Sequence, residues 1–192
     1  MTQTRVAFYG DSYTLGTGAS DAAHRWSTII CGQRGWREFN PSVNGLGFVR
    51  NRRNFGDGDL PSQIIASNPD IVFVTLGLND NFAFATDAEH IRVQISTDLE
   101  YLRLALPMAR FIVVEPFWYT DDRPDSLSII SAWVKAAADF IDADYIVGAS
   151  HWIEHHPEWM AADAEHPNDE GYAHIAVRMD AALEELRLPA HV

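Results

Sequence analysis

The sequence predicts an α/β protein, folded as a three-layer α/β/α sandwich around a parallel five-stranded sheet. Short apolar runs alternate with longer segments of helical spacing along the chain, which is the pattern of a parallel sheet covered by helices on both faces. The 192 residues contain no internal repeat and no low-complexity linker, so we expect a single domain spanning residues 1–192.

Five short runs are expected to be strands. The clearest is Ile71–Leu76, a continuous apolar and β-branched run of the kind found in strands that are buried on both faces. The other expected strands are Val6–Tyr9, Glu38–Val43, Phe111–Val114 and Tyr145–Val147. Right-handed crossover connections leave few topologies for such a chain, and the three-layer sandwich is the simplest of them.

The segments between these strands are expected to be helical. Asp87–Ala105 repeats apolar residues at helical spacing, and Leu60–Ser67 has a proline in its first turn, where proline is tolerated. The remaining expected helices are Ala22–Cys31, Ser126–Ile141 and a last one from Glu170 to Leu186.

The charge of the chain argues against two classes of partner. With 14 basic and 27 acidic residues, the formal net charge of -13 repels nucleic-acid backbones and anionic membrane surfaces. No run reaches the roughly 20 apolar residues of a membrane helix. The N-terminal residues lack the apolar core of a signal peptide, so a cytoplasmic location is expected unless a leader was removed. We therefore expect neither a nucleic-acid nor a membrane partner.

Ser12 stands at the end of the first expected strand, in the segment Gly10-Asp11-Ser12. The carboxyl ends of strands are where an open α/β sheet presents ligand-binding groups. A serine attacks a carbonyl carbon only when a base removes its proton and a third group orients that base. Asp163 and His166 are close enough in sequence for the carboxylate to reach Nδ1 of the imidazole, which leaves Nε2 to face Ser12.

Each of these residues also has a simpler structural interpretation. A serine after a glycine is usually a cap or turn residue, and an Asp-x-x-His pair is usually solvated. Asn79 alone is a common turn former. The catalytic hypothesis depends on their combination: three polar motifs that follow strands and one carboxylate–imidazole pair.

Four sequence blocks carry a resemblance to the SGNH/GDSL hydrolase family. They are Gly10-Asp-Ser12, Asn44-Gly-Leu-Gly-Phe48, Gly77-Leu-Asn79-Asp80 and Asp163-Ala-Glu-His166-Pro. The glycine block is the loosest match, and Tyr13 stands where many members carry leucine, a difference expected to alter packing rather than chemistry. The resemblance implies a flavodoxin-like sandwich and ester hydrolysis without a metal or cofactor.

The resemblance also implies a role for each matched residue. Ser12 would be the nucleophile, His166 the general base and acid, and Asp163 the orienting carboxylate. The oxyanion donors would be the backbone N–H groups of Ser12 and of a glycine in the second block, together with the side-chain amide of Asn79. Gly45 fits the glycine role best, with Gly47 second. Asp11 and Asp80 are expected to support the loops through hydrogen bonds.

We accordingly expect a serine esterase acting on small or short-acyl carboxylic esters, including acetylated carbohydrates. A thioesterase or lysophospholipase using the same site is the nearest alternative. A non-catalytic carbohydrate-binding module is an alternative of a different class. The partner in the expected case is a small-molecule ester.

Three further features bear on the site. The histidines of His151–His156 have a spacing that suggests zinc, but they lack the His-Glu-x-x-His order, so no metal site is expected. Arg50, Arg52 and Arg53 are either contacts for an anionic substrate group or ordinary exposed arginines. Four aromatic residues either line the rim of the site or pack the bases of loops: Trp118, Tyr119, Trp152 and Trp159.

Overall fold

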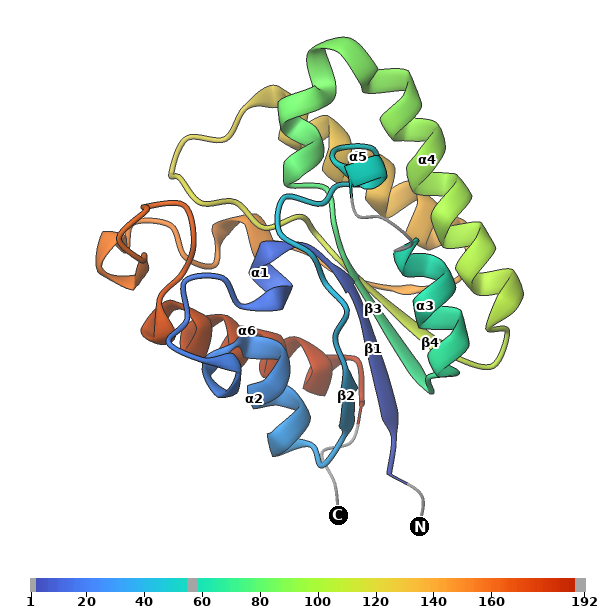
Figure 1. Cartoon of the computed structure of the whole chain (residues 1–192), viewed down its shortest axis with the longest axis horizontal. Coiled ribbons are helices and arrows are strands. Elements are labelled where there is room, and N and C mark those ends of the chain that lie inside the picture. The colour runs from blue at the N-terminus through green and yellow to red at the C-terminus, as the bar shows by residue number, and fades with distance from the viewer. Residues whose placement is uncertain (1–2, 55–58, 189–192) are drawn as a thin grey trace.

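The computed structural model describes residues 3–54 and 59–188 and shows the expected three-layer α/β/α arrangement (Figure 1). All strand pairs are parallel, and the strand order β2-β1-β3-β4-β5 is the flavodoxin-like order. The strands are β1 (Arg5–Gly10), β2 (Arg37–Phe39), β3 (Ile71–Thr75), β4 (Arg110–Val114) and β5 (Asp144–Ile146). The predicted fold class is confirmed.

Helices cover both faces of the sheet. The α-helices are α1 (Ser12–Leu15), α2 (Trp26–Gln33), α3 (Leu60–Ser67), α4 (Phe84–Ala105), α5 (Asp125–Phe140) and α6 (Asp169–Glu185). Short 3₁₀ turns are η1 (Ala22–His24), η2 (Arg52–Asn54), η3 (Asn79–Ala83), η4 (Ala149–His151) and η5 (Pro157–Trp159). Helices α2 and α6 lie on one face, while α3, α4 and α5 lie mainly on the other (Figure 1).

The two faces of the sheet bury alternate residues of the same strands. In β1, Val6 and Phe8 pack into the core under α2 and α6, whereas Ala7 and Tyr9 pack into the core under α3 and α4. Every residue of β3 is buried, as its continuous apolar sequence predicts.

Three predicted boundaries were wrong. Strand β2 ends at Phe39 rather than at Val43, because Pro41 follows and has no N–H for a strand ladder. The predicted helix Ala22–Cys31 is divided at Arg25, whose extended backbone (ψ 145°) separates η1 from α2. Helix α4 begins at Phe84 and is kinked at Asp87, where φ is -123°.

Within the described residues, no helix is both long and apolar enough to cross a membrane.

Candidate active site

The carboxyl edge of the sheet brings three of the four sequence blocks into direct contact. The side-chain amide of Asn79 donates hydrogen bonds to Oδ2 of Asp11 at 3.2 Å and to the carbonyl oxygen of Leu46 at 3.0 Å. Asp11 follows β1, Asn79 begins η3 after β3, and Leu46 lies in the glycine block. A single amide therefore joins the Gly-Asp-Ser, glycine and Gly-x-Asn-Asp blocks.

Ser12 is the first residue of α1, a single helical turn. The carboxylate of Asp11 caps this turn by accepting from the backbone N–H of Tyr13 at 2.9 Å. A Cβ at Gly10 would lie 2.5 Å from Thr14 Cβ, so only glycine fits where β1 meets α1. The Ser12 residue is 5% exposed, and its backbone N–H has no acceptor among the residues that the structure describes.

Asp163 and His166 form the predicted pair. Nδ1 of His166 lies 2.8 Å from Oδ2 of Asp163, while Oδ1 accepts from the backbone N–H groups of Glu165 and His166 at 3.0 Å each. The hydrogen bond from His166, together with that from Glu165, lowers the pKa of Asp163 to about 2. Since an ionised carboxylate only accepts, Nδ1 of His166 carries a proton, which leaves Nε2 as the ring nitrogen that can act as a base.

Two tyrosines hold the loop of His166 against the segment of Ser12. Tyr13 donates from its hydroxyl to the carbonyl oxygen of Glu165 at 2.7 Å, and its ring centroid lies 6.0 Å from that of His166. Tyr172, on α6, donates to the carbonyl oxygen of Thr17 at 2.7 Å and contacts that of Ser12 at 3.4 Å. No hydrogen bond joins the side chains of Ser12 and His166 in the described part of the chain, and such bonds often form only with bound substrate.

Gly18 is a further point of close contact between these segments. A Cβ at Gly18 would lie 3.0 Å from His166 Cβ and 2.5 Å from the carbonyl oxygen of Pro167. The positive φ of 93° at Gly18 is also a conformation that favours glycine. The nucleophile segment and the base segment therefore approach each other too closely at Gly18 for a side chain to fit.

The carboxylate of Asp80 holds the glycine block in place through hydrogen bonds. Its buried carboxylate accepts from the backbone N–H groups of Phe48, Val49 and Arg50 at 2.7, 2.9 and 3.1 Å. A Cβ at Gly47 would lie 2.5 Å from Asp80 Oδ1, so the carboxylate approaches the loop only because this residue is glycine. Burial raises the pKa of Asp80. The predicted supporting role of Asp80 is confirmed.

The two glycine candidates for an oxyanion donor differ in their hydrogen bonds. The N–H of Gly47 already donates to the carbonyl oxygen of Arg50 at 2.9 Å. The N–H of Gly45 has no acceptor within the described ranges, and φ at this residue is 70°. Asn51 holds the same peptide segment by donating from its amide to the carbonyl oxygen of Gly45 at 2.9 Å. Gly45 is therefore the candidate with an available donor.

Asp11 also has the supporting role that was predicted for it. Its side chain caps α1 and accepts from the Asn79 amide. Complete burial raises the pKa of Asp11 to about 7, and the nearby carboxylate of Asp80 adds to the effect.

Both N–H groups of the Asn79 side-chain amide already have acceptors, so Asn79 contacts an oxyanion only if one of these hydrogen bonds is exchanged. The bond to Asp11 is the longer of the two.

Of the two interpretations of the four aromatic residues, packing in the interior agrees with the burial of most of them. Trp118, Trp152 and Trp159 are buried, and Tyr119 is half-buried. The exposed aromatic residue in this region is Phe82, which is 52% exposed and stacks on Trp118 with ring centroids 6.4 Å apart. Sequence reasoning did not single out Phe82, because nothing in its neighbours indicates exposure.

Trp159 has a structural role that its sequence neighbours do not indicate. Its indole lies between the imidazoles of His156 and His174, with ring centroids 3.5 and 3.8 Å away and nearly parallel planes. Its carbonyl oxygen accepts from the N–H of Asn168 at 2.8 Å. The stack fixes the base of the loop that carries His166.

The histidines considered for zinc each contact a carboxylate. Nδ1 of His151 lies 3.0 Å from the carboxylate of Glu154. The same atom lies 2.8 Å from Asp121 in the case of His155 and 2.7 Å from Glu158 in the case of His156. Within the part of the chain that the structure describes, no three His, Cys, Asp or Glu side chains are grouped as a metal site requires.

Comparisons with known proteins show which family and which solved structures the chain resembles. The model of the GDSL-like lipase/acylhydrolase family matches residues 8–174. The chain is 28% identical to the GDSL lipase Rv0518 of Mycobacterium tuberculosis over 186 residues, covering 89% of this chain and 78% of that protein.

Solved structures with the same fold include two esterases. The esterase EstA from Pseudoalteromonas sp. superposes with a TM-score of 0.74 at 14% identity, covering 97% of this chain and 100% of that one. A family two carbohydrate esterase from Cellvibrio japonicus gives a TM-score of 0.75 at 15% identity, covering 97% of this chain and 62% of that one.

Proposed function

The chain belongs to the GDSL-like lipase/acylhydrolase family and is a carboxylic ester hydrolase, and from this premise we propose that Ser12, His166 and Asp163 are its catalytic triad. The observation that carries the proposal is the 2.8 Å contact between His166 and Asp163 in a loop packed against the segment of Ser12. This pair leaves a neutral imidazole nitrogen, the base that the reaction needs, on the side away from the carboxylate.

In the proposed reaction, Nε2 of His166 takes the proton of the Ser12 hydroxyl as Oγ attacks the ester carbonyl carbon. The tetrahedral intermediate collapses when His166 returns that proton to the leaving alcohol, and an acyl group remains on Ser12. Water then attacks the acyl group with His166 again acting as base, which releases the acid and restores the serine. Asp163 keeps the proton on Nδ1 and stabilises the imidazolium that forms in each half.

The proposed oxyanion donors are the backbone N–H groups of Ser12 and Gly45 and the amide of Asn79. Such donors stabilise the negative charge that develops on the carbonyl oxygen, and the loss of one costs about 10²–10³ in turnover. The availability of the Ser12 and Gly45 N–H groups within the described residues supports their assignment. For Asn79, the proposal requires that its bond to Asp11 is exchanged for the oxyanion.

We propose small or short-acyl esters, including acetylated carbohydrates, as the substrates. The fold likeness to the carbohydrate esterase from Cellvibrio japonicus supports this choice. A thioesterase or lysophospholipase activity is distinguished by a panel of acyl-chain lengths that includes acyl-CoA esters. A preference for long chains or for thioesters would contradict the proposal. A non-catalytic carbohydrate-binding role does not agree with membership of a hydrolase family.

Labelling with a fluorophosphonate probe tests the assignment of the nucleophile. EstA has been solved in a form inhibited by monoethylphosphonate, so organophosphorus reagents are suitable probes for this fold. We expect covalent labelling that maps to Ser12 by mass spectrometry and that is lost in Ser12→Ala. Labelling at another residue, or equal labelling of the variant, would refute the assignment.

A further inference from the structure

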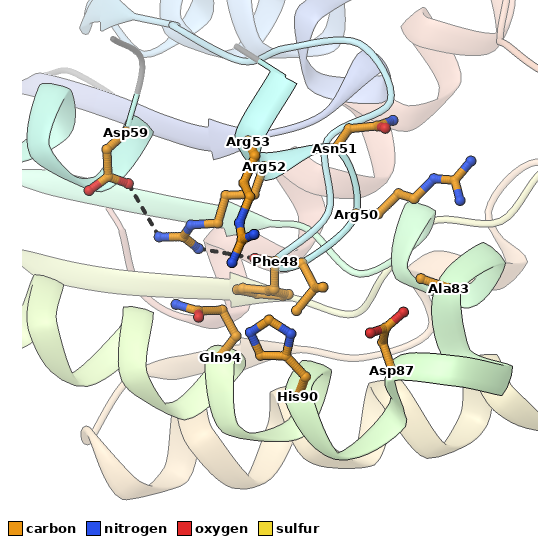
Figure 2. Close-up of a pocket in the computed structure, with 11 residues that line it drawn as sticks. Phe48, Arg50, Asn51, Arg52, Arg53, Asp59, Ala83, Asp87, His90 and Gln94 are labelled. Atoms are coloured by element: carbon orange, nitrogen blue, oxygen red, sulfur yellow. Dashed lines mark hydrogen bonds and ion pairs between the residues drawn. The ribbon is translucent and has the colours of Figure 1, made fainter. Parts of the chain in front are cut away.

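A groove of about 790 Å³ lies between the segment 48–53 and the N-terminal half of α4 (Figure 2). This volume is within the range of about 300–1,000 Å³ that is usual for small-molecule sites. Ser12 and His166 do not line it, so it is separate from the proposed triad. Its lining includes the charged residues Arg50, Arg52, Arg53, Asp59 and Asp87, together with His90.

One of the three arginines already has its partners. The guanidinium of Arg52 donates to Asp98 Oδ1 at 2.9 Å and to Asp59 at 3.2 Å, and also to the carbonyl oxygen of Phe48 at 3.1 Å. Asp98 is buried, and it also accepts from the hydroxyl of Tyr9 at 2.7 Å. Arg52 therefore supports the floor of the groove and is not available to a ligand.

The other two arginines are available. Neither Arg50 nor Arg53 forms an ion pair or a side-chain hydrogen bond with any residue that the structure describes. In Figure 2 the guanidinium of Arg53 points into the groove, toward the side from which Gln94 and His90 extend. Asp87 lies at the other end, near Ala83, where its carboxylate accepts from Thr86 at 2.7 Å. Among the described carboxylates, Asp59 and Asp98 pair with Arg52, which leaves Arg50 and Arg53 as the arginines of the groove without such a partner.

These two arginines contrast with the negative charge of the protein as a whole. With a net charge of -13, the protein repels anions over most of its surface. Arg50 and Arg53, which have no ion pair among the described residues, oppose that repulsion at the groove. Guanidinium is the side-chain group best suited to carboxylate and phosphate, because it presents paired N–H donors in a plane.

The groove is linked to the proposed oxyanion site through Asn51. Asn51 lines the groove, and its amide donates to the carbonyl oxygen of Gly45 at 2.9 Å. Phe48 and Val49 also line it, and their N–H groups are held by Asp80. A group bound in the groove therefore contacts the same peptide segment that carries the available N–H of Gly45.

We infer that this groove binds a negatively charged group of the ester, a carboxylate or a phosphate, through Arg53 and Arg50. The inference rests on the proposed function, since it assigns a substrate class to that site. An anionic group held here orients the ester relative to Ser12 and lowers KM for charged esters without changing the chemistry of neutral ones.

Matched pairs of esters test this preference. Mono-4-nitrophenyl succinate is compared with neutral 4-nitrophenyl butyrate for a charge on the acyl side, and 4-acetoxybenzoate with phenyl acetate for a charge on the alcohol side. The variants are Arg53→Gln and Arg50→Gln. Arg178→Gln is the control, because this arginine of α6 is exposed and has no ion pair within the described ranges.

We expect each groove variant to lower the ratio of kcat/KM for the anionic ester to that for its neutral partner about five- to tenfold, mainly through KM. The pair that responds identifies which side of the ester enters the groove. The neutral esters and the control should be unaffected. An unchanged ratio in both groove variants, or an equal fall in Arg178→Gln, would overturn the inference while leaving the proposed function intact if neutral esters are still hydrolysed.

Calorimetric titration tests binding without hydrolysis. Pyrophosphate and succinate are titrated separately into the wild-type protein and into Arg53→Gln, which distinguishes phosphate from carboxylate as the bound group. We expect binding of at least one of them to weaken about fivefold or more in the variant. Absence of binding to the wild type, or equal affinity in both proteins, would overturn the inference even if no ester in the panel were a substrate.

Discussion

The hydroxyl of Tyr13 donates to the carbonyl oxygen of Glu165 at 2.7 Å, so the residue after Ser12 is bonded to the residue before His166. The two are separated by 152 residues in the sequence. The Tyr13 ring also stacks on the ring of Phe117, a residue that follows β4, with centroids 5.5 Å apart. This contact holds the Tyr13 ring in place. Tyr13 thus sets the distance between the proposed nucleophile and its base.

Tyr13→Phe should separate the effect of the hydrogen bond from that of the ring stacking, since it removes the hydroxyl and keeps the ring. Loss of the hydrogen bond should cost about 1 kcal/mol of unfolding free energy. We expect kcat to fall several-fold with little change in KM, because the loop of His166 loses one attachment while the substrate site is unaltered. Steady-state kinetics and urea unfolding measure both quantities. A wild-type kcat would show that this bond does not position the base.

The lowered pKa of Asp163 predicts how acid affects the protein. With a folded-state pKa of about 2 and an ordinary value of 3.8, Asp163 contributes stability that is complete above about pH 4 and is lost as the pH falls toward 2. Asp163→Asn should therefore weaken the pH dependence of unfolding between pH 4 and 2. It should also lower kcat up to about 10⁴-fold, because an amide can hold the wrong tautomer of His166. A variant with full activity at neutral pH would contradict the triad.

Asp11 should affect the pH dependence of stability in the opposite direction to Asp163. Its pKa is raised from 3.8 to about 7, so the folded state binds more protons than the unfolded state between these values, and stability decreases as the pH rises from 4 to 7. Asp11→Asn keeps a capping oxygen and removes the titration. Urea unfolding at pH 5 and 7 should show a smaller difference for the variant than for the wild type. An identical difference would mean that Asp11 is not the group responsible.

Gly47→Ala tests the close approach of Asp80 to the glycine block. The new Cβ would lie 2.5 Å from Asp80 Oδ1, and relief of this overlap should cost about 1–3 kcal/mol of stability and displace the segment of Gly45. Gly32→Ala is the matched control. It lies in α2 with nothing within 4 Å of the added Cβ, and it should stabilise the helix by about 0.5–1 kcal/mol. Equal melting temperatures for the two variants would show that Asp80 does not require glycine at position 47.

The sequence predicted the fold and the contact between Asp163 and His166 because those signals are local. The continuous apolar run of β3 and the spacing of Asp163 and His166 are visible without a structure. The sequence does not show which of Gly45 and Gly47 has a free N–H group. That depends on the hydrogen bond from the N–H of Gly47 to the carbonyl oxygen of Arg50, which is set by the turn of the backbone.

Long-range contacts account for the rest of what sequence reasoning missed. Tyr13 meets Glu165, and Arg52 meets Asp98, only after distant elements have packed together. For the same reason, the sequence left open which of the three neighbouring arginines are free. The structure assigns Arg52 to a buried carboxylate, while Arg50 and Arg53 have no such partner among the described residues.

The most direct test of the central claim is hydrolysis of 4-nitrophenyl acetate by the wild-type protein and by Ser12→Ala. We expect the wild type to release 4-nitrophenol and the variant to lose this activity, with an unchanged circular dichroism spectrum. Retention of full activity by a correctly folded Ser12→Ala protein would contradict the proposal that Ser12 is the nucleophile.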